Sequence, residues 1–159
     1  MVVDSDRNVI EAIKTSLQAN LVDPREQFET RDRNWVHDDS PLISATYPRI
    51  QVRKRGPSTT RIIDLGWDFM EHKTMILDIQ FWTKSPFKWS DGTEYLKDEA
   101  LVREYLHKIW VAIKDQGSTL YTDEGITGFK NMGEEDAYFE PNTELFTGIV
   151  SVRVWWFRT

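Results

Sequence analysis

Residues 74–83 have the sequence TMILDIQFWT, and the alternation of its side chains decides the fold. Successive side chains of a strand point to opposite faces, so Leu77, Ile79 and Phe81 fall together on one apolar face. The other face is mixed and carries Ile76, Asp78, Gln80 and Trp82. We predict a strand with one face in the core and the other turned toward solvent or another subunit.

The flanking residues extend this strand into a sheet. Residues 61–70 form a second β-rich run, which predicts a long antiparallel hairpin that turns at Glu71-His72-Lys73. An earlier strand begins at Tyr47 and Pro48, and Arg55-Gly56-Pro57-Ser58 is expected to break it. The last strand covers 145–158. Short strand pieces are expected at 120–121 and 126–132, followed by an acidic turn at 133–136.

Two segments have the three-to-four spacing of a helix face. The first covers residues 6–21, with Asp4, Ser5 or Asp6 as its N-cap, and the second runs from about residue 93 to Gln116. Gly117 is expected to close the second helix in a left-handed conformation. Helices on one face of a mainly antiparallel sheet make an α+β fold. We predict one domain over residues 1–159, with a long loop or arm at about 24–46.

Composition excludes several classes of protein. The 159 residues carry a net charge of −6, which argues against attraction of the whole surface to nucleic acid or to an anionic membrane. Cysteine is absent, so disulfides and thiolate metal sites are excluded. No apolar run approaches the roughly 20 residues of a membrane span. We expect a soluble intracellular protein.

Residues suited to catalysis are scattered. His37, His72 and His107 lie in three different predicted elements, and a solvated loop is the favoured interpretation of the local group His37-Asp38-Asp39. We therefore predict no catalytic residue, metal or cofactor. One alternative is a small α+β ligand-binding domain or enzyme with a pocket between helix and sheet. Another is an RNA-binding sheet, which Asp78 and the net charge oppose.

Charge is distributed unevenly along the chain. Residues 49–61 contain five basic residues and no acid, whereas residues 115–144 contain eight acids and only Lys130 as a base. Opposite poles suit head-to-tail association of copies, in which the basic segment of one meets the acidic segment of the next. The interface candidates on the basic side are Arg53, Lys54, Arg55 and Arg61. Aromatic candidates on the sheet face away from the helices are Trp82, Trp155 and Phe157, joined by Trp89.

The order of elements resembles a known family. A capped N-terminal helix, the strand YPRIQV at 47–52, the hairpin through Gly66-Trp67 and 77–82, the helix at 96–115 and a terminal strand ending in aromatics are similar to the tail-terminator, or tail-completion, proteins of tailed bacteriophages and related tailed viruses. The resemblance covers nearly the whole chain in element order, but no single signature residue carries it.

The resemblance implies a structural virion protein, assembled in the host cytoplasm, that forms a hexameric ring at the head-proximal end of the tail. Such a ring ends polymerisation of the tail-tube protein, joins the tail to the head-tail connector and lets DNA pass through its lumen without sequence-specific binding. Under this hypothesis the hairpin tip at Glu71, His72 and Lys73 contacts neighbouring rings. The acidic loop is expected near the lumen, with Asp123, Glu124, Glu134, Glu135 and Asp136. Because the loop at 24–46 is long for this family, another neck component remains an alternative.

Overall fold

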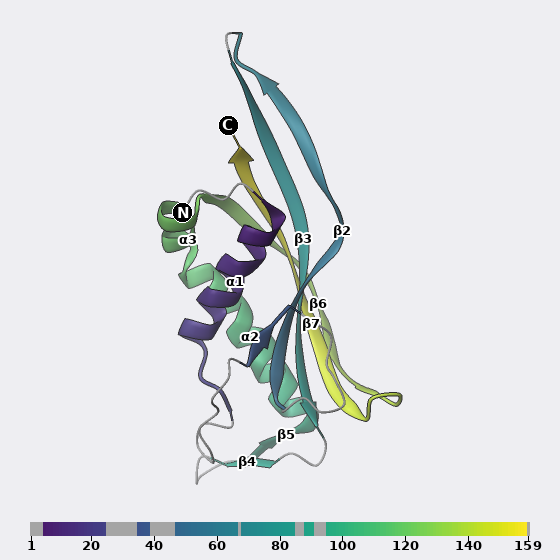
Figure 1. Cartoon of the computed structure of the whole chain (residues 1–159). Helices are drawn as coiled ribbons and strands as arrows, with labels where there is room; N and C mark the ends of the chain where they lie inside the picture. Colours follow the sequence, from purple (N-terminus) through teal and green to yellow (C-terminus); the bar gives the residue numbers. More distant parts are fainter. Residues whose placement is uncertain are drawn as a thin grey trace.

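Figure 1 shows the computed structural model of the chain, which describes residues 5–24, 35–38, 47–66, 68–84, 88–90 and 95–158. In chain order its elements are α1 (Asp6–Asn20), β1 (Val36–His37), β2 (Arg49–Asp64), β3 (Phe69–Lys84), β4 (Lys88–Ser90), β5 (Tyr95–Lys97), α2 (Asp98–Asp115), α3 (Gly117–Glu124), β6 (Ile126–Glu140) and β7 (Leu145–Arg158). The helices lie on one side of the large sheet, which confirms the predicted α+β fold.

The large sheet has five strands in the order β1-β2-β3-β7-β6. All its neighbours are antiparallel except β1, which runs parallel to β2 over two residues. β3 is the central strand, paired with β2 on one side and β7 on the other. Strands β4 and β5 form a separate two-stranded sheet.

The core lies between the helices and the apolar face of the sheet. Leu77, Ile79 and Phe81 of β3 are fully buried there, as their alternation predicts. The ring of Tyr105 on α2 stacks on Phe81, with centroids 4.7 Å apart. The other large side chains of this core that are fully buried include Trp156, Ile13, Leu17, Ile50, Met75, Leu101, Ile109 and Ile113.

Two predictions about the strands are wrong. The hairpin turns at Leu65–Asp68, where the Leu65 N–H donates to the Asp68 carbonyl at 2.8 Å, and not at Glu71-His72-Lys73. The segment 55–58 does not end its strand. Instead β2 continues to Asp64 with a register shift between Arg55 and Thr59, because Gly56 adopts a φ of 68° and the extra residues are accommodated as a bulge.

The helix boundaries also differ from the prediction at several points. Ser5 is the N-cap of α1, as one of the three candidates proposed. Helix α2 starts at Asp98, because residues 95–97 belong to β5. Gly117 begins α3, and the left-handed helix end is Gly125, with a φ of 72°. Residues 120–121 therefore lie in a helix, and the acidic segment 133–136 is part of β6 and not a turn.

The predicted arm at 24–46 contains one short strand, β1, whose neighbour Trp35 accepts a hydrogen bond from the Ile50 N–H at 2.9 Å. Apart from Pro24 and residues 35–38, that segment lies outside the described residues.

Candidate interaction surfaces

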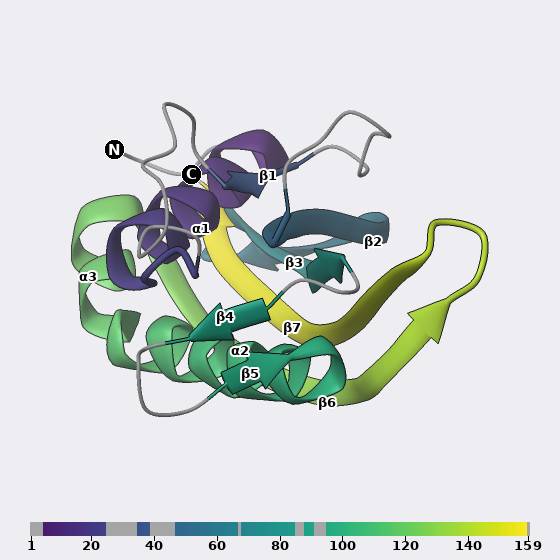
Figure 2. The ribbon, with the colours of Figure 1, turned by 90° about the horizontal axis from the view of Figure 1, so that it is seen from below.

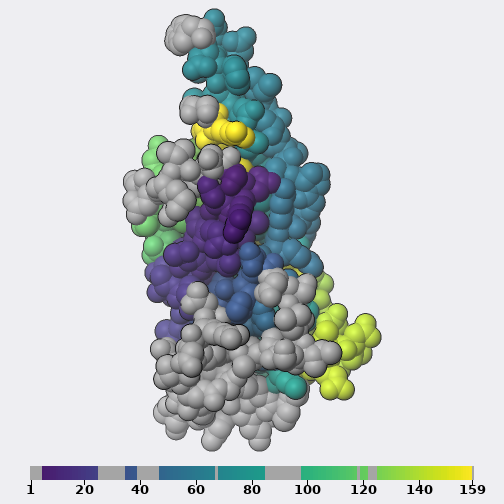
Figure 3. All heavy atoms as spheres, in the orientation of Figure 1, coloured from purple at the N-terminus to yellow at the C-terminus, as the bar shows by residue number. Residues whose placement is uncertain are grey.

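The β2–β3 hairpin projects beyond the rest of the molecule. Strand β7 ends at Arg158, which pairs with Glu71, so only β2 and β3 continue to the turn. Figure 1 shows this end reaching well past the C-terminus, and Figure 3 shows it as a narrow projection from the space-filled body. We call residues 62–66 and 68–69 the arm tip.

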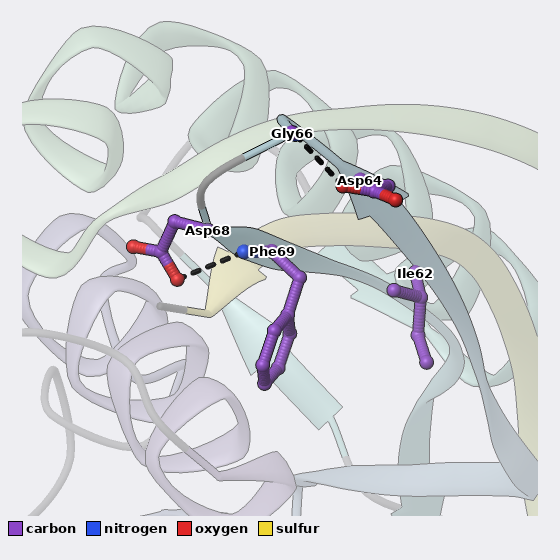
Figure 4. A pocket seen from close by; sticks show the side chains of 5 residues that line it. All are labelled: Ile62, Asp64, Gly66, Asp68 and Phe69. Carbon is purple, nitrogen blue, oxygen red and sulfur yellow. Dashed lines mark hydrogen bonds between the residues drawn. The ribbon is translucent and has the colours of Figure 1, made fainter.

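The described residues of the arm tip expose apolar side chains. Ile62, Leu65 and Phe69 are exposed by 66%, 43% and 60%. The side chains of Ile62 and Phe69 point to the same side of the hairpin and flank a hollow of about 460 Å³ (Figure 4). A monomer gains little by exposing large apolar residues at the end of a two-stranded projection, so the tip is suited to contact with another chain.

Two carboxylates hold the backbone of this turn. Asp64 accepts the Gly66 N–H through Oδ1 at 2.8 Å, and Asp68 accepts the Phe69 N–H through its own Oδ1 at 2.8 Å (Figure 4). Gly66 has a φ of 85°, a conformation that favours glycine. These bonds fix the described residues on both sides of the turn.

The three residues that the sequence predicts at the hairpin tip lie inside the sheet. Glu71, His72 and Lys73 are half-buried residues of β3 that pair with both β2 and β7. Lys73 Nζ lies 3.7 Å from Glu71 Oε2 on one face, and the His72 ring lies against Phe157 on the other, with centroids 5.1 Å apart.

A basic surface covers the sheet face opposite the helices. Strand pairing places Arg55, Ile76, Arg153 and Lys130 in one row across four strands. On the same face, Arg53 lies in the next row and Arg61 lies two rows away in the other direction. The five cations are exposed. We call this group the basic face; its members are Arg53, Arg55, Arg61, Lys130 and Arg153.

Asp78 is the acid that the basic face surrounds. Its side chain is 6% exposed and accepts hydrogen bonds from Arg55 Nε at 2.9 Å, Arg55 Nη2 at 2.5 Å and Ser151 Oγ at 2.8 Å. These bonds to the carboxylate raise the pKa of Arg55. Arg53 Nη2 lies 3.8 Å away. Asp78 therefore does not oppose a basic surface, because it is buried and already bonded within the protein.

Lys54 belongs to another surface. It lies on the helix side of β2 and forms an ion pair with Asp6 in the first turn of α1. Ser58 also donates to Asp6. Partial burial raises the pKa of Asp6, but the bonds from Lys54 and Ser58 outweigh it and lower that pKa overall. Sequence order alone grouped Lys54 with Arg53 and Arg55, whereas strand alternation separates them.

A second hairpin, formed by β6 and β7, projects in another direction, as Figure 2 shows from below. Along β6 and in its turn it carries the acids Glu134, Glu135, Asp136, Glu140 and Glu144, together with exposed Tyr138 and Phe139. We call residues 134–144 the acidic hairpin. Asp136 accepts a hydrogen bond from Arg103 Nε at 2.9 Å, which lowers the pKa of that carboxyl. The side chains of Asp123 and Glu124 lie outside the described part of the chain.

The predicted aromatic face is correct in orientation but is not one patch. Trp82 and Trp155 lie on the basic side of the sheet. Trp82 is buried, and Trp155 pairs with Thr74, eight residues from Trp82, or roughly 26 Å along the strand. Only Trp155 and Phe157 lie close to the basic face; Trp155 is half-buried and Phe157 is 38% exposed. The side chain of Trp89 is outside the described set.

Among the residues that the structure describes, no group of three or more His, Asp or Glu side chains is placed to hold a metal ion. His37 and Asp38 lie in or next to β1, and Asp39 is outside this set. Within the described segments, no helix has the length and apolar character needed to span a lipid bilayer.

No protein-family model matches the chain, and no curated protein matches its sequence. A proposal about its role therefore depends on the two projecting hairpins and the basic face.

Proposed function

We propose that this chain is a structural virion protein that forms a ring, in the manner of a tail terminator. The ring stands at the head-proximal end of the tail, ends polymerisation of the tail-tube protein and joins the tail to the head-tail connector. DNA passes through the lumen without sequence-specific binding. The observation that carries the proposal is the β2–β3 arm, which exposes Ile62, Leu65 and Phe69 beyond the end of the sheet.

The geometry of the arm supports contact between stacked rings. Three large apolar side chains lie at the end of a projection whose turn is fixed by backbone hydrogen bonds. Residues already held by such bonds lose little conformational freedom on binding, so their exposed apolar area contributes more of its burial energy to the contact. Such a projection extends past its own subunit and reaches a neighbour above or below it.

The distribution of charge supports association of copies within one ring. The basic face and the acidic hairpin are separate surfaces of the same chain. A contact between two different surfaces is heterologous, and repeated copies of it close into a ring when the rotation permits. The net charge of −6 also suits a ring that surrounds DNA, since few fixed cations would hold phosphates during passage.

The test is capping of tail tubes. Tail-tube protein from the same virus is polymerised with increasing amounts of this protein, and tube lengths and ends are recorded by negative-stain electron microscopy. We expect shorter tubes that carry a ring at one end. The variant Ile62→Ser with Phe69→Ser should bind tube ends at least about tenfold more weakly, because it removes the apolar tip.

A matched control removes exposed apolar side chains elsewhere. Val22 and Tyr121 lie on the helix side of the molecule and are 61% and 60% exposed. Val22→Ser with Tyr121→Ser should cap tubes as the unmodified protein does. Equal capping by the tip variant and this control would reject the assigned role of the arm, and failure of the unmodified protein to bind or shorten tubes would reject the function.

A further inference from the structure

The basic face has unusual composition for a protein with an excess of acid. It gathers five exposed cations on one side of the sheet, against buried Asp78 and exposed Glu135. Trp155 and Phe157 lie in adjacent rows of the same face. No described helix covers this side. Exposed cations beside aromatic rings are complementary to a partner that presents both carboxylates and aromatic side chains.

The acidic hairpin of the same chain has that chemistry. Glu144 is exposed in its turn, and Glu134 and Glu135 are exposed farther back on β6. The Phe139 ring lies against Phe146 with centroids 5.1 Å apart. Figures 1 and 2 show the hairpin bending away from the body of the molecule. The end of the hairpin, residues 139–144, projects from the body and is available to a neighbouring copy, whereas Glu135 lies near Arg55 of its own copy.

Two copies are not expected to pair through hydrogen bonding of their sheet edges, because the edge strands of this chain are protected against strand addition. Strand β6 is an edge strand, but its pairing with β7 shifts register at three places. The free edge of β2 contains Pro57, which has no N–H to donate. Bulges, charges and proline on an edge are devices that prevent strand addition. Contact between copies is therefore expected through side chains.

We propose that the acidic hairpin of one copy docks on the basic face of the next copy. This inference rests on the proposed ring and names the two surfaces that build it. The contact joins two different surfaces, so each copy uses one as donor and the other as receptor. Sequence alone suggested the lumen for Glu134, Glu135 and Asp136; the projection of the hairpin favours the contact between copies.

A second copy fits the basic face better than a nucleic acid does. The protein carries −6 overall, so a long polyanion is repelled by most of the surface that it approaches. The hairpin is short, and it also supplies Tyr138 and Phe139 for the aromatic residues beside the basic face. Oligonucleotide binding is the competing outcome that the experiment measures.

The experiment uses complementary charge reversals in the full-length chain. The face variant is Lys130→Glu with Arg153→Glu, two exposed residues that pair across β6 and β7. The hairpin variant is Glu140→Lys with Glu144→Lys. Arg55 is left unchanged because it bonds the buried carboxylate of Asp78. Self-association is measured by sedimentation velocity at about 50 mM and about 500 mM salt, since screening weakens charge contacts.

Each variant alone should self-associate at least about tenfold more weakly than the unmodified protein, because like charges then face each other. An equimolar mixture should recover association, since each variant supplies the surface that the other needs. The controls Arg7→Glu with Lys114→Glu, and Glu11→Lys with Asp115→Lys, make the same charge changes on the helix side. These controls should associate normally, and circular dichroism should show every variant folded.

The proposal is overturned if either variant alone associates normally, if the mixture does not recover, or if the unmodified protein stays monomeric at about 100 µM both alone and on tube ends. It is also overturned if the basic face binds a single-stranded oligonucleotide while the protein does not self-associate. Recovery in the mixture without tube capping would support the interface and reject the tail role. Tube capping that is insensitive to these charge changes would support the tail role and reject the proposed interface.

Discussion

Removing Arg55 should destabilise the protein more than its position at the surface suggests. The Arg55 side chain is 54% exposed, but its partner Asp78 is only 6% exposed. The substitution Arg55→Met leaves a buried carboxylate with Ser151 Oγ at 2.8 Å and Arg53 Nη2 at 3.8 Å. Breaking a buried ion pair costs about 3–5 kcal/mol, and the nearby Arg53 places this case at the lower end, about 3 kcal/mol.

Urea unfolding at pH 7 measures this loss. With an m-value of about 2 kcal/mol/M, a loss of about 3 kcal/mol lowers the midpoint by about 1.5 M. Adding Asp78→Asn to Arg55→Met should recover part of it, because the charge that lacks its partner is removed. A double variant as unstable as Arg55→Met, or less stable, would show that the buried carboxylate is not the source of the loss.

Three further predictions concern pH and the fit between helix and sheet. Burial raises the pKa of Tyr105 above its usual value near 10, so the unfolded chain releases this proton first. Stability should therefore fall by up to roughly 1.4 kcal/mol per pH unit above pH 10, and Tyr105→Phe should show a smaller fall in urea titrations at each pH. The pKa of Asp6 is lowered in the fold, so its contribution is present above pH 4 and is lost as the pH falls through that folded value. The stability advantage of the unmodified protein over Asp6→Asn should shrink between pH 5 and pH 3, and a constant difference would contradict the ion pair. A Cβ at Gly148 would lie 2.7 Å from Leu106 Cδ1 and 2.9 Å from Val102 Cγ1. Gly148→Ala should cost about 1–3 kcal/mol in thermal unfolding, and adding Leu106→Ala to it should cost less than the two single losses combined.

The sequence predicts the core strands because burial imposes a strict period. In β3 the residues Leu77, Ile79 and Phe81 face the helices and are fully buried, as their alternation predicts. The hairpin turn is harder to place because the arm has no core to select its register. Both faces of the hairpin over residues 61–73 carry a mixture of polar and apolar side chains. The turn is set instead by Gly66 at positive φ and by the hydrogen bonds that Asp64 and Asp68 accept from backbone N–H groups.

The interaction surfaces were predictable only in part. The excess of basic residues at 49–61 and of acids at 115–144 is visible in the sequence. Which of them share a surface depends on strand pairing. Arg153 and Lys130 join Arg55 through cross-strand neighbours, while adjacent Lys54 points to the other face. The signal that identifies Lys54 is the period of two, which places it on the same face as Ile50 and Val52.

The length distribution of tail tubes tests the central claim most directly. Tail-tube protein is polymerised with and without this chain, and tube lengths and end-on views are compared by electron microscopy. The proposal predicts that mean length falls as the chain is added and that one end of each tube carries a closed ring of copies. Tubes of unchanged length with bare ends would contradict it.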